Sequence, residues 1–345
     1  MNRSLSNTHK PLDHSRRRPL YWLRRVVIGV IIATVALVVA GALFQVTAAA
    51  IDARRYPSPG QLLDVGGYRL HIHCVGQGSP TVILDAASID TVSGWAWVQP
   101  EVARVTRVCA YDRAGLGWSD LSPAPPDATQ NTPALHTLLQ NAGIEAPYVL
   151  VAHSFGGLYA RAFAHQYPDE VAGLVLIEAF HPDNRARLGQ PETMPNAPDE
   201  GQIAAGQVLA RFGFFRLVSF TPVDPALPLQ QQRELRAYYA SPRYLDQVRA
   251  MTGAFPALLA QVRETGSLAD RPLAVVLGTA SENWTGELRA MQDELTALSS
   301  NSRQVVVDGA DHLSLVHNQQ HAQATSAAIL QMVEAIRANN SLAGN

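Results

Sequence analysis

Short, continuously apolar runs recur along most of this chain, and glycine, proline or polar residues bound each of them. Strands that are apolar throughout are typical of a mostly parallel sheet that is covered on both faces. Segments with apolar positions at helical spacing lie between the runs, so we expect an α/β fold with helices on both faces of a central sheet. Strands are predicted at residues 68–75, 81–84, 107–111, 147–152, 171–177, 273–277 and 303–307, and helices at residues 130–143, 156–167 and 318–338.

Residues 180–270 depart from this alternation. They contain proline-rich pieces and helical stretches with many aromatic side chains. We expect a helical insertion that forms a cap over the rest of the domain. Most of its aromatic residues would build the cap's own core, and a few would line a pocket. These aromatic residues are Phe212, Phe214, Phe215, Phe220, Tyr238, Tyr239, Tyr244 and Phe255.

The N-terminal segment predicts a membrane anchor. Residues 1–25 form a basic tail, and residues 26–50 contain no charged side chain. A helix of about 20 apolar residues spans the hydrocarbon core of a bilayer. Basic residues before the stretch outnumber those just after it, which places the N-terminus in the cytoplasm and the following domain outside, in the periplasm or beyond. The alternative is a signal peptide cleaved near Ala50, but the apolar stretch is longer than a usual signal core.

Composition narrows the class of protein. Hydrophobic residues make up 47% of the chain and charged residues 16%, which indicates a globular protein. The formal net charge is −2, so the chain has no electrostatic footprint for nucleic acid. The two cysteines, Cys74 and Cys109, match neither a zinc site nor a redox pair.

The strongest local motif is an apolar strand that runs into His153, Ser154 and Phe155, followed by two glycines that open a helix. A serine at such a strained turn needs small residues two positions before and after it, and Ala152 and Gly156 meet this need. The turn exposes the hydroxyl at the carboxyl edge of the sheet. It also directs the Phe155 N–H and the helix N-terminus toward the place where an oxyanion would form.

With this turn, three further segments resemble the α/β-hydrolase superfamily in its chain order: residues 108–119, 168–177 and 309–312. The resemblance covers about residues 56–337 and implies an α/β-hydrolase domain over residues 56–340, with the cap inserted at about 180–270. It also implies Ser154 as nucleophile and His312 as base, because His312 lies in a loop after a late strand. His153 is expected to point away from the serine hydroxyl. For His317 and His321, one helical turn apart, a solvated helix face is favoured over a metal site.

Two carboxylates remain candidates for the acid. Glu178 ends a strand on the same edge as Ser154, whereas Glu282 follows the next strand, at the position that is commoner in the superfamily. We favour Glu178, because the residues around Glu282 match the usual loop poorly. The second oxyanion donor would be the N–H of Ala87, although the glycine of related loops is missing there.

Other residues of these motifs are expected to be structural. Asp112 and Arg113 would form a buried pair that braces their loop. Cys74 and Cys109 should lie on two nearby strands, where a disulfide and two buried thiols are both compatible with the pattern.

These observations predict a serine hydrolase that cleaves an ester through an acyl-enzyme on Ser154, in the manner of a carboxylesterase or lipase. No metal or organic cofactor is implied. The anchor and the aromatic cap favour a small, apolar ester substrate. The same residues would also serve an amidase, an acyltransferase or a perhydrolase-type enzyme, and a binding protein could keep the fold without catalysis. A serine at the turn argues against dehalogenase and epoxide hydrolase chemistry, which an aspartate would suggest.

Overall fold

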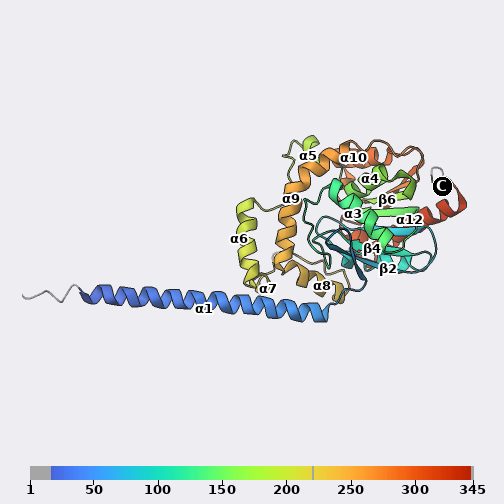
Figure 1. Cartoon of the computed structure of the whole chain (residues 1–345). Coiled ribbons are helices and arrows are strands. Elements are labelled where there is room, and N and C mark those ends of the chain that lie inside the picture. Colours follow the sequence, from blue (N-terminus) through green and yellow to red (C-terminus); the bar gives the residue numbers. More distant parts are fainter. Residues whose placement is uncertain (1–16, 220, 343–345) are drawn as a thin grey trace, which may run out of the picture.

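The computed structural model describes residues 17–219 and 221–342 of the chain. Phe220, one of the aromatic residues expected in the cap, and residues 1–16 of the expected basic tail lie outside the described residues. A sheet with helices on both faces forms the main body of the protein, and one long helix extends away from it (Figure 1). This is the α/β architecture that the alternating apolar runs predict.

The described residues form a single sheet of eight strands, ordered β1-β2-β4-β3-β5-β6-β7-β8. Strands β1 and β2 are antiparallel to their neighbours, and the rest of the sheet is parallel. All seven predicted strands are present. The sequence did not predict β1, because its four residues include only two apolar ones. The strands are β1 (Gln61–Asp64), β2 (Arg69–Val75), β3 (Thr81–Asp85), β4 (Val108–Asp112), β5 (Tyr148–His153), β6 (Val171–Ile177), β7 (Leu273–Gly278) and β8 (Ser302–Val307).

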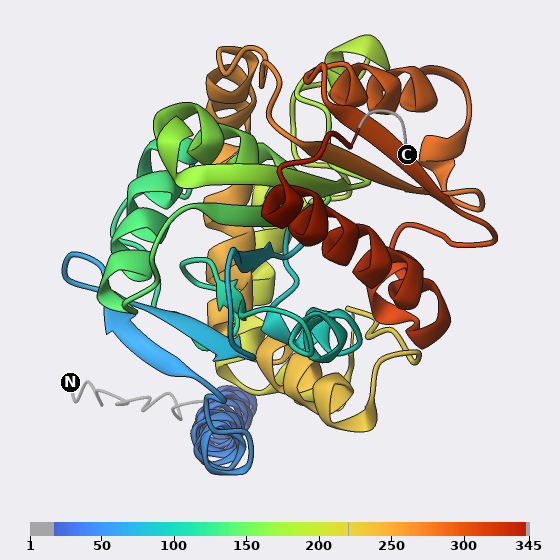
Figure 2. The same ribbon diagram turned by 90° about the vertical axis from the view of Figure 1, so that its right-hand side faces the viewer.

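Alternate residues of each strand face opposite helical layers, as the pleat of a strand requires. On β5, Leu150 and Ala152 belong to one apolar core, whereas Val149 and Val151 belong to the other. Figure 2 shows the two layers on either side of the strands. One layer contains α3 (Ala128–Asn141), α4 (Gly156–Gln166) and α10 (Gly286–Thr296), and the other contains α2 (Val98–Val102), α11 (Ser314–His317) and α12 (Gln319–Ala338).

The described residues between β6 and β7 form five helices, and we call these helices and the loops that join them the cap. Most of their aromatic side chains contact one another, but Phe255 packs on Phe155 and Phe180 beside the end of β5. Hydrogen bonds also join the cap to the main body, including one of 3.0 Å from the Tyr238 hydroxyl to the Gly115 carbonyl. The cap helices are α5 (Asn184–Arg187), α6 (Glu200–Arg211), α7 (Phe214–Leu217), α8 (Leu229–Tyr239) and α9 (Pro242–Arg263).

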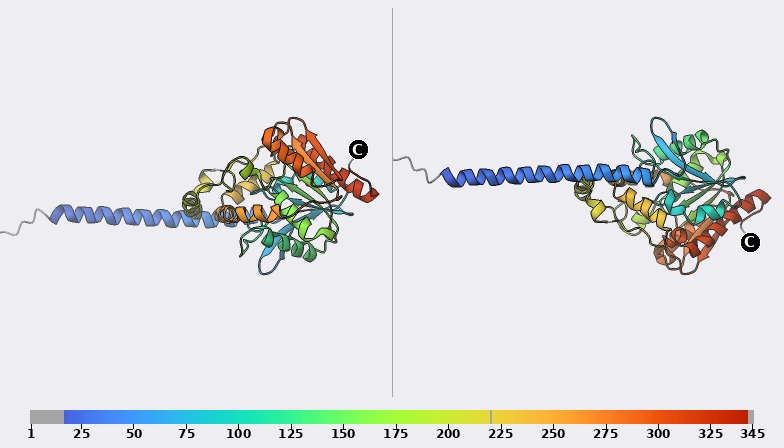
Figure 3. Two further views of the ribbon diagram at one scale, coloured as in Figure 1. Left: turned by 90° about the horizontal axis from the view of Figure 1, so that it is seen from above. Right: turned by 90° about the horizontal axis from the view of Figure 1, so that it is seen from below.

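The N-terminal helix α1 (Arg17–Arg55) is long and apolar enough to cross a membrane over Tyr21–Arg55. Most of its length projects away from the main body, while its C-terminal part passes beside α6 and α7 of the cap (Figures 1 and 3). At this contact the backbone of Gly213 lies so close to the Phe44 ring that an added Cβ would be 2.6 Å from it. The helix is therefore packed against the cap as well as joined to β1.

A disulfide joins Cys74 of β2 to Cys109 of β4. The two residues are directly opposite in the antiparallel register, and their Cα atoms are 4.0 Å apart. The structure thus selects the disulfide over the two buried thiols that the sequence also allowed.

Candidate active site

The turn between β5 and α4 places Ser154 at the carboxyl edge of the sheet. Its φ of +55° lies in the left-handed region, which costs a residue other than glycine about 1–3 kcal/mol. Backbone hydrogen bonds hold this conformation: the Ser154 N–H donates to Ile177 O at 3.0 Å, and the Ser154 carbonyl accepts from Phe180 N at 2.9 Å. Because β6 and the segment after it provide both partners, the sheet itself fixes the serine.

Two glycines after the serine allow close approach of neighbouring segments. A Cβ on Gly156 would lie 2.6 Å from the carbonyl oxygen of Asp85, and one on Gly157 would lie 2.4 Å from the Cβ of Ala179. Real Cβ atoms do not tolerate such contacts with backbone or buried atoms. The two glycines therefore bring the segments after β3 and β6 against the start of α4.

The structure brings His312 to Glu178. The Nδ1 atom of His312 lies 2.8 Å from Oε2 of Glu178, which is fully buried. Glu178 also accepts hydrogen bonds from the backbone N–H of Gly278 at 2.9 Å and from the Ser281 hydroxyl at 2.6 Å. With Nδ1 held by this carboxylate, the Nε2 atom is the ring nitrogen that remains to exchange a proton.

One cavity of about 400 Å³ connects the sequence-predicted residues. Ser154, Phe155, Glu178 and His312 line it, and Glu282 lies at its exposed side. Glu282 begins the short helix η4 (Glu282–Trp284), and the hydrogen bond from the His312 ring goes to Glu178.

Neither the Phe155 nor the Ala87 N–H donates a hydrogen bond within the described part of the chain. Arg113 holds the segment that contains Ala87: its guanidinium donates to the carbonyls of Ala86 and Ala87 at 2.7 and 2.6 Å and to that of Ser88 at 3.1 Å. The segment is thus fixed by a side chain rather than by a glycine turn.

The expected pair of Asp112 and Arg113 is wrong. Arg113 forms its ion pair with Asp85 at the end of β3, whereas Asp112 contacts Nδ1 of His71 at 2.8 Å. Successive residues at the end of a strand point to opposite sides, so the two side chains cannot meet. Both side chains are nevertheless buried, as expected.

A family model described as the alpha/beta hydrolase fold matches residues 80–319. The chain belongs to the α/β-hydrolase fold family. An uncharacterized protein of Schizosaccharomyces pombe is 25% identical over 296 residues, which cover 74% of this chain but only 52% of that protein. The chain therefore corresponds to about half of that relative's length.

Solved structures share the fold of this α/β hydrolase. A putative ancestral haloalkane dehalogenase has a TM-score of 0.60 and 18% identity, and covers 81% of this chain and 99% of its own. A membrane phospholipase A described as a bacterial virulence factor has a TM-score of 0.55 and 17% identity, and covers 92% of this chain and 99% of its own. At these identities the likeness shows the fold alone.

Three more histidines lie near the site of this α/β hydrolase. His153 points away from the serine: its Nε2 atom lies 2.9 Å from the backbone oxygen of His312, and burial, followed by the nearby His312, holds its pKa well below the usual value. The expectation of a solvated face for His317 is wrong, because His317 is buried against Asp90 and Asp224. His321 contacts the Ser314 hydroxyl at 2.9 Å. In the described residues, no three His, Cys, Asp or Glu side chains, those of His317, Asp90 and Asp224 included, are placed so that they could hold a metal ion.

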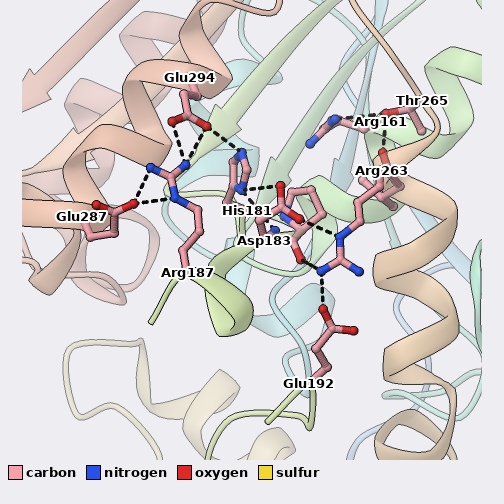
Figure 4. A network of polar contacts seen from close by, with 11 residues as sticks. Arg161, His181, Asp183, Arg187, Glu192, Arg263, Thr265, Glu287 and Glu294 are labelled. Carbon is pink, nitrogen blue, oxygen red and sulfur yellow. Dashed lines mark hydrogen bonds and ion pairs between the residues drawn. The ribbon is translucent and has the colours of Figure 1, made fainter. Parts of the chain in front are cut away.

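The sequence did not reveal a polar network beside the cavity (Figure 4). Arg187 of α5 pairs with Glu287 and Glu294 of α10, and Arg263 of α9 pairs with Asp183 and Glu192. These pairs tie the start of the cap to α10 on one side and to α9 on the other. The side chain of His181 lies within the network and also lines the cavity, and burial lowers its pKa.

Proposed function

We propose that this α/β hydrolase is a serine hydrolase that cleaves carboxylic esters. The observation that carries the proposal is the His312–Glu178 contact in the same cavity as Ser154, the residue at the strained turn. A carboxylate on one ring nitrogen fixes the tautomer and stabilises the imidazolium, while the other nitrogen accepts the serine proton.

In the proposed reaction, Ser154 Oγ attacks the acyl carbonyl and its proton passes to Nε2 of His312. The tetrahedral oxyanion receives hydrogen bonds from the N–H groups of Phe155 and Ala87. The ester C–O bond then breaks, and His312 gives its proton to the leaving alcohol. Water attacks the acyl-enzyme and loses a proton to His312. The bond between Ser154 Oγ and the acyl carbon then breaks, and His312 returns the proton to Oγ as the acid is released, with Glu178 ionised throughout. In this scheme Glu282 has no role in orienting the base.

We also propose that α1 is a single membrane span, with the N-terminus in the cytoplasm and the residue 56–340 domain outside. Three observations support this: the uncharged stretch of residues 26–50, the excess of arginine before it, and the Cys74–Cys109 disulfide, which suits an oxidising compartment. One neighbour in fold is described as a membrane phospholipase A, so ester cleavage at a membrane is compatible with this architecture.

An active-site fluorophosphonate probe tests the nucleophile. We expect covalent labelling of the intact protein, loss of labelling in Ser154→Ala and full labelling in Ser302→Ala, which removes a hydroxyl from the far edge strand β8. Absence of labelling in the intact protein would support a binding protein that retains the fold.

The acyl substrate is tested separately. p-Nitrophenyl esters of graded chain length should be hydrolysed by the intact protein and not by Ser154→Ala. Labelling by the probe without turnover of any ester would contradict ester cleavage and would instead support an amidase, an acyltransferase or a perhydrolase-type reaction on the same residues.

A further inference from the structure

An exposed apolar corner of the cap lies beside the long helix α1. The corner consists of the end of α6 and the short helix α7, and it exposes Leu209, Leu217 and Val218. Leu217 is 76% exposed, more than any other large hydrophobic residue in the described chain. A group of exposed apolar side chains on one edge of a folded domain indicates a surface that meets another apolar phase.

The contacts of this corner with α1 fix its height relative to a bilayer. If the hydrocarbon core begins just after Arg25, a rise of 1.5 Å per residue over about 30 Å carries its far boundary to about Gln45. The corner meets the helix at this level, because Phe212 and Gly213 pack against Gly41 and Phe44. On this placement, the exposed Leu209 and Leu217 lie where the acyl chains end in the leaflet around the C-terminal part of α1.

Farther toward the C-terminal end of α1, the contacts between the helix and the cap are polar. The guanidinium of Arg216 donates to the Gln45 side chain at 2.7 Å and to Asp52 at 2.6 Å, so it bridges about two turns of α1 just beyond the hydrocarbon boundary. On this placement, Gln45 lies at the hydrocarbon boundary and Asp52 about 10 Å beyond it, on the headgroup side. The charge of Arg216 is balanced by Asp52, and it serves to join the cap to the helix.

Two further arginines lie at the same level without a carboxylate partner. A hollow of about 370 Å³ is lined by Arg216, Leu217, Arg233 and Arg236 together with Asp52. Within the part of the chain that the structure describes, neither Arg233 nor Arg236 forms an ion pair, and both are exposed. Two guanidinium groups without a carboxylate partner, of which Arg236 donates a hydrogen bond to Gln232 at 3.2 Å, match a lipid phosphate above its acyl chains.

We propose that the α6–α7 corner inserts into the leaflet around the outer end of α1, with Leu217 among the acyl chains and Arg233 and Arg236 on anionic lipid headgroups. The inference rests on the proposed membrane span of α1 and not on the chemistry at Ser154. It also holds for either orientation of the span. The cap is then a second membrane contact, and α7 stands between the bilayer and a cap cavity of about 770 Å³ that Phe214 and Phe215 line.

Depth is tested with the full-length chain in lipid vesicles that contain phosphatidylglycerol. Both native cysteines are in the disulfide, so Leu217→Cys provides one thiol for an environment-sensitive fluorophore. We expect blue-shifted emission and at least threefold protection from iodide quenching. A label on Val306→Cys, 46% exposed on the far edge strand, should stay fully accessible. Equal iodide quenching of the two labels would overturn the proposal.

The headgroup contact is tested in the same labelled chain. In vesicles of phosphatidylcholine alone, and in the Arg233→Gln/Arg236→Gln variant, protection of the Leu217 label should fall by at least half. Arg107→Gln/Arg303→Gln removes the same charge elsewhere and should leave protection unchanged. Protection that is insensitive to both the lipid charge and the two cap arginines would overturn the anionic headgroup contact. Fluorophosphonate labelling of Ser154 is unaffected by either outcome, so failure here is distinct from failure of the proposed function.

Discussion

Two histidines five residues apart, one in the loop after β8 and the other at the end of α11, have opposite surroundings. His312 has one carboxylate partner, Glu178, and about a third of its side chain is exposed in the cavity with Ser154. His317 is buried between two carboxylates, with Nε2 2.9 Å from Asp90 and Nδ1 3.4 Å from Asp224. The second distance is long for a hydrogen bond but within the range of an ion pair.

The number of carboxylates beside each ring determines whether the imidazole can exchange a proton. A ring with one acid keeps a nitrogen for proton exchange, whereas a ring between two acids is held as a cation. Although burial alone would lower it, the pKa of His317 is raised to about 9 because Asp90 and Asp224 favour the charged form. Asp224 lies in the cap and Asp90 follows β3, so His317 joins the cap to the main body. The short segment from His312 to the end of α11 thus carries both a proposed base and a structural ion pair.

The largest difference should appear in activity. His312→Ala removes the proposed base, so ester turnover should fall by about 10⁴–10⁶-fold. His317→Gln should keep turnover within about tenfold, provided that the assay temperature is below its melting temperature. Steady-state kinetics of the two variants measure this directly. Similar losses in both would remove the distinction between the two histidines.

The acid partner of His312 should have the next largest effect. Glu178→Gln keeps the shape but removes the charge that stabilises the imidazolium, so kcat should fall by about 10³–10⁴-fold with little change in KM. Glu282→Gln is the matched control and should lower kcat by less than about threefold. The reverse order of the two variants would assign the acid to Glu282.

Stability should show the opposite order. His317→Gln leaves Asp90 buried without its cation, and breaking a buried pair in this way costs about 3–5 kcal/mol of the free energy of unfolding. His312→Ala should change that free energy by less than about 1 kcal/mol, because its side chain is partly exposed and Glu178 keeps its hydrogen bonds from Gly278 and Ser281. Urea unfolding of both variants at pH 6 gives the comparison. An unchanged midpoint for His317→Gln would mean that the cap is not held by this pair.

The pH dependence gives the smallest and most specific effect. Because the folded pKa of His317 is about 9 and the unfolded value is about 6.5, its stabilisation is complete below pH 6.5 and is lost as pH rises through 9. The total loss should be about 3 kcal/mol. The half-buried His73 and the buried His153 and His181 have lowered pKa values and act in the opposite sense, so the relevant quantity is the difference between the intact protein and His317→Gln. A difference that stays constant from pH 6 to pH 10 would contradict the assigned cation.

Sequence patterns predicted what depends on neighbouring residues and missed what depends on distant ones. The strands and the turn at Ser154 follow from local apolar runs and small residues, and the family comparison confirms the fold. The sequence alone does not decide between Glu178 and Glu282 as the acid. Glu178 and His312 are 134 residues apart, and only the approach of two loops joins them. Helical spacing continued through Asn318 predicts that His317 and His321 lie on one helix face. Asn318 is extended, so α11 ends at His317 and the ring turns inward.

The hydrogen bonds from Arg113 to the segment after β3 restrict the substitutions that this chain can accept. One guanidinium bonds to Asp85 and three successive carbonyls while it lies 5.0 Å from the Tyr159 ring. A lysine ammonium has the charge but not the planar fork, and could satisfy only part of this set. The position of the Ala87 amide therefore depends on a residue 26 positions downstream, and substitutions around Ala87 are tolerable only while the arginine just after the neighbouring strand β4 is kept.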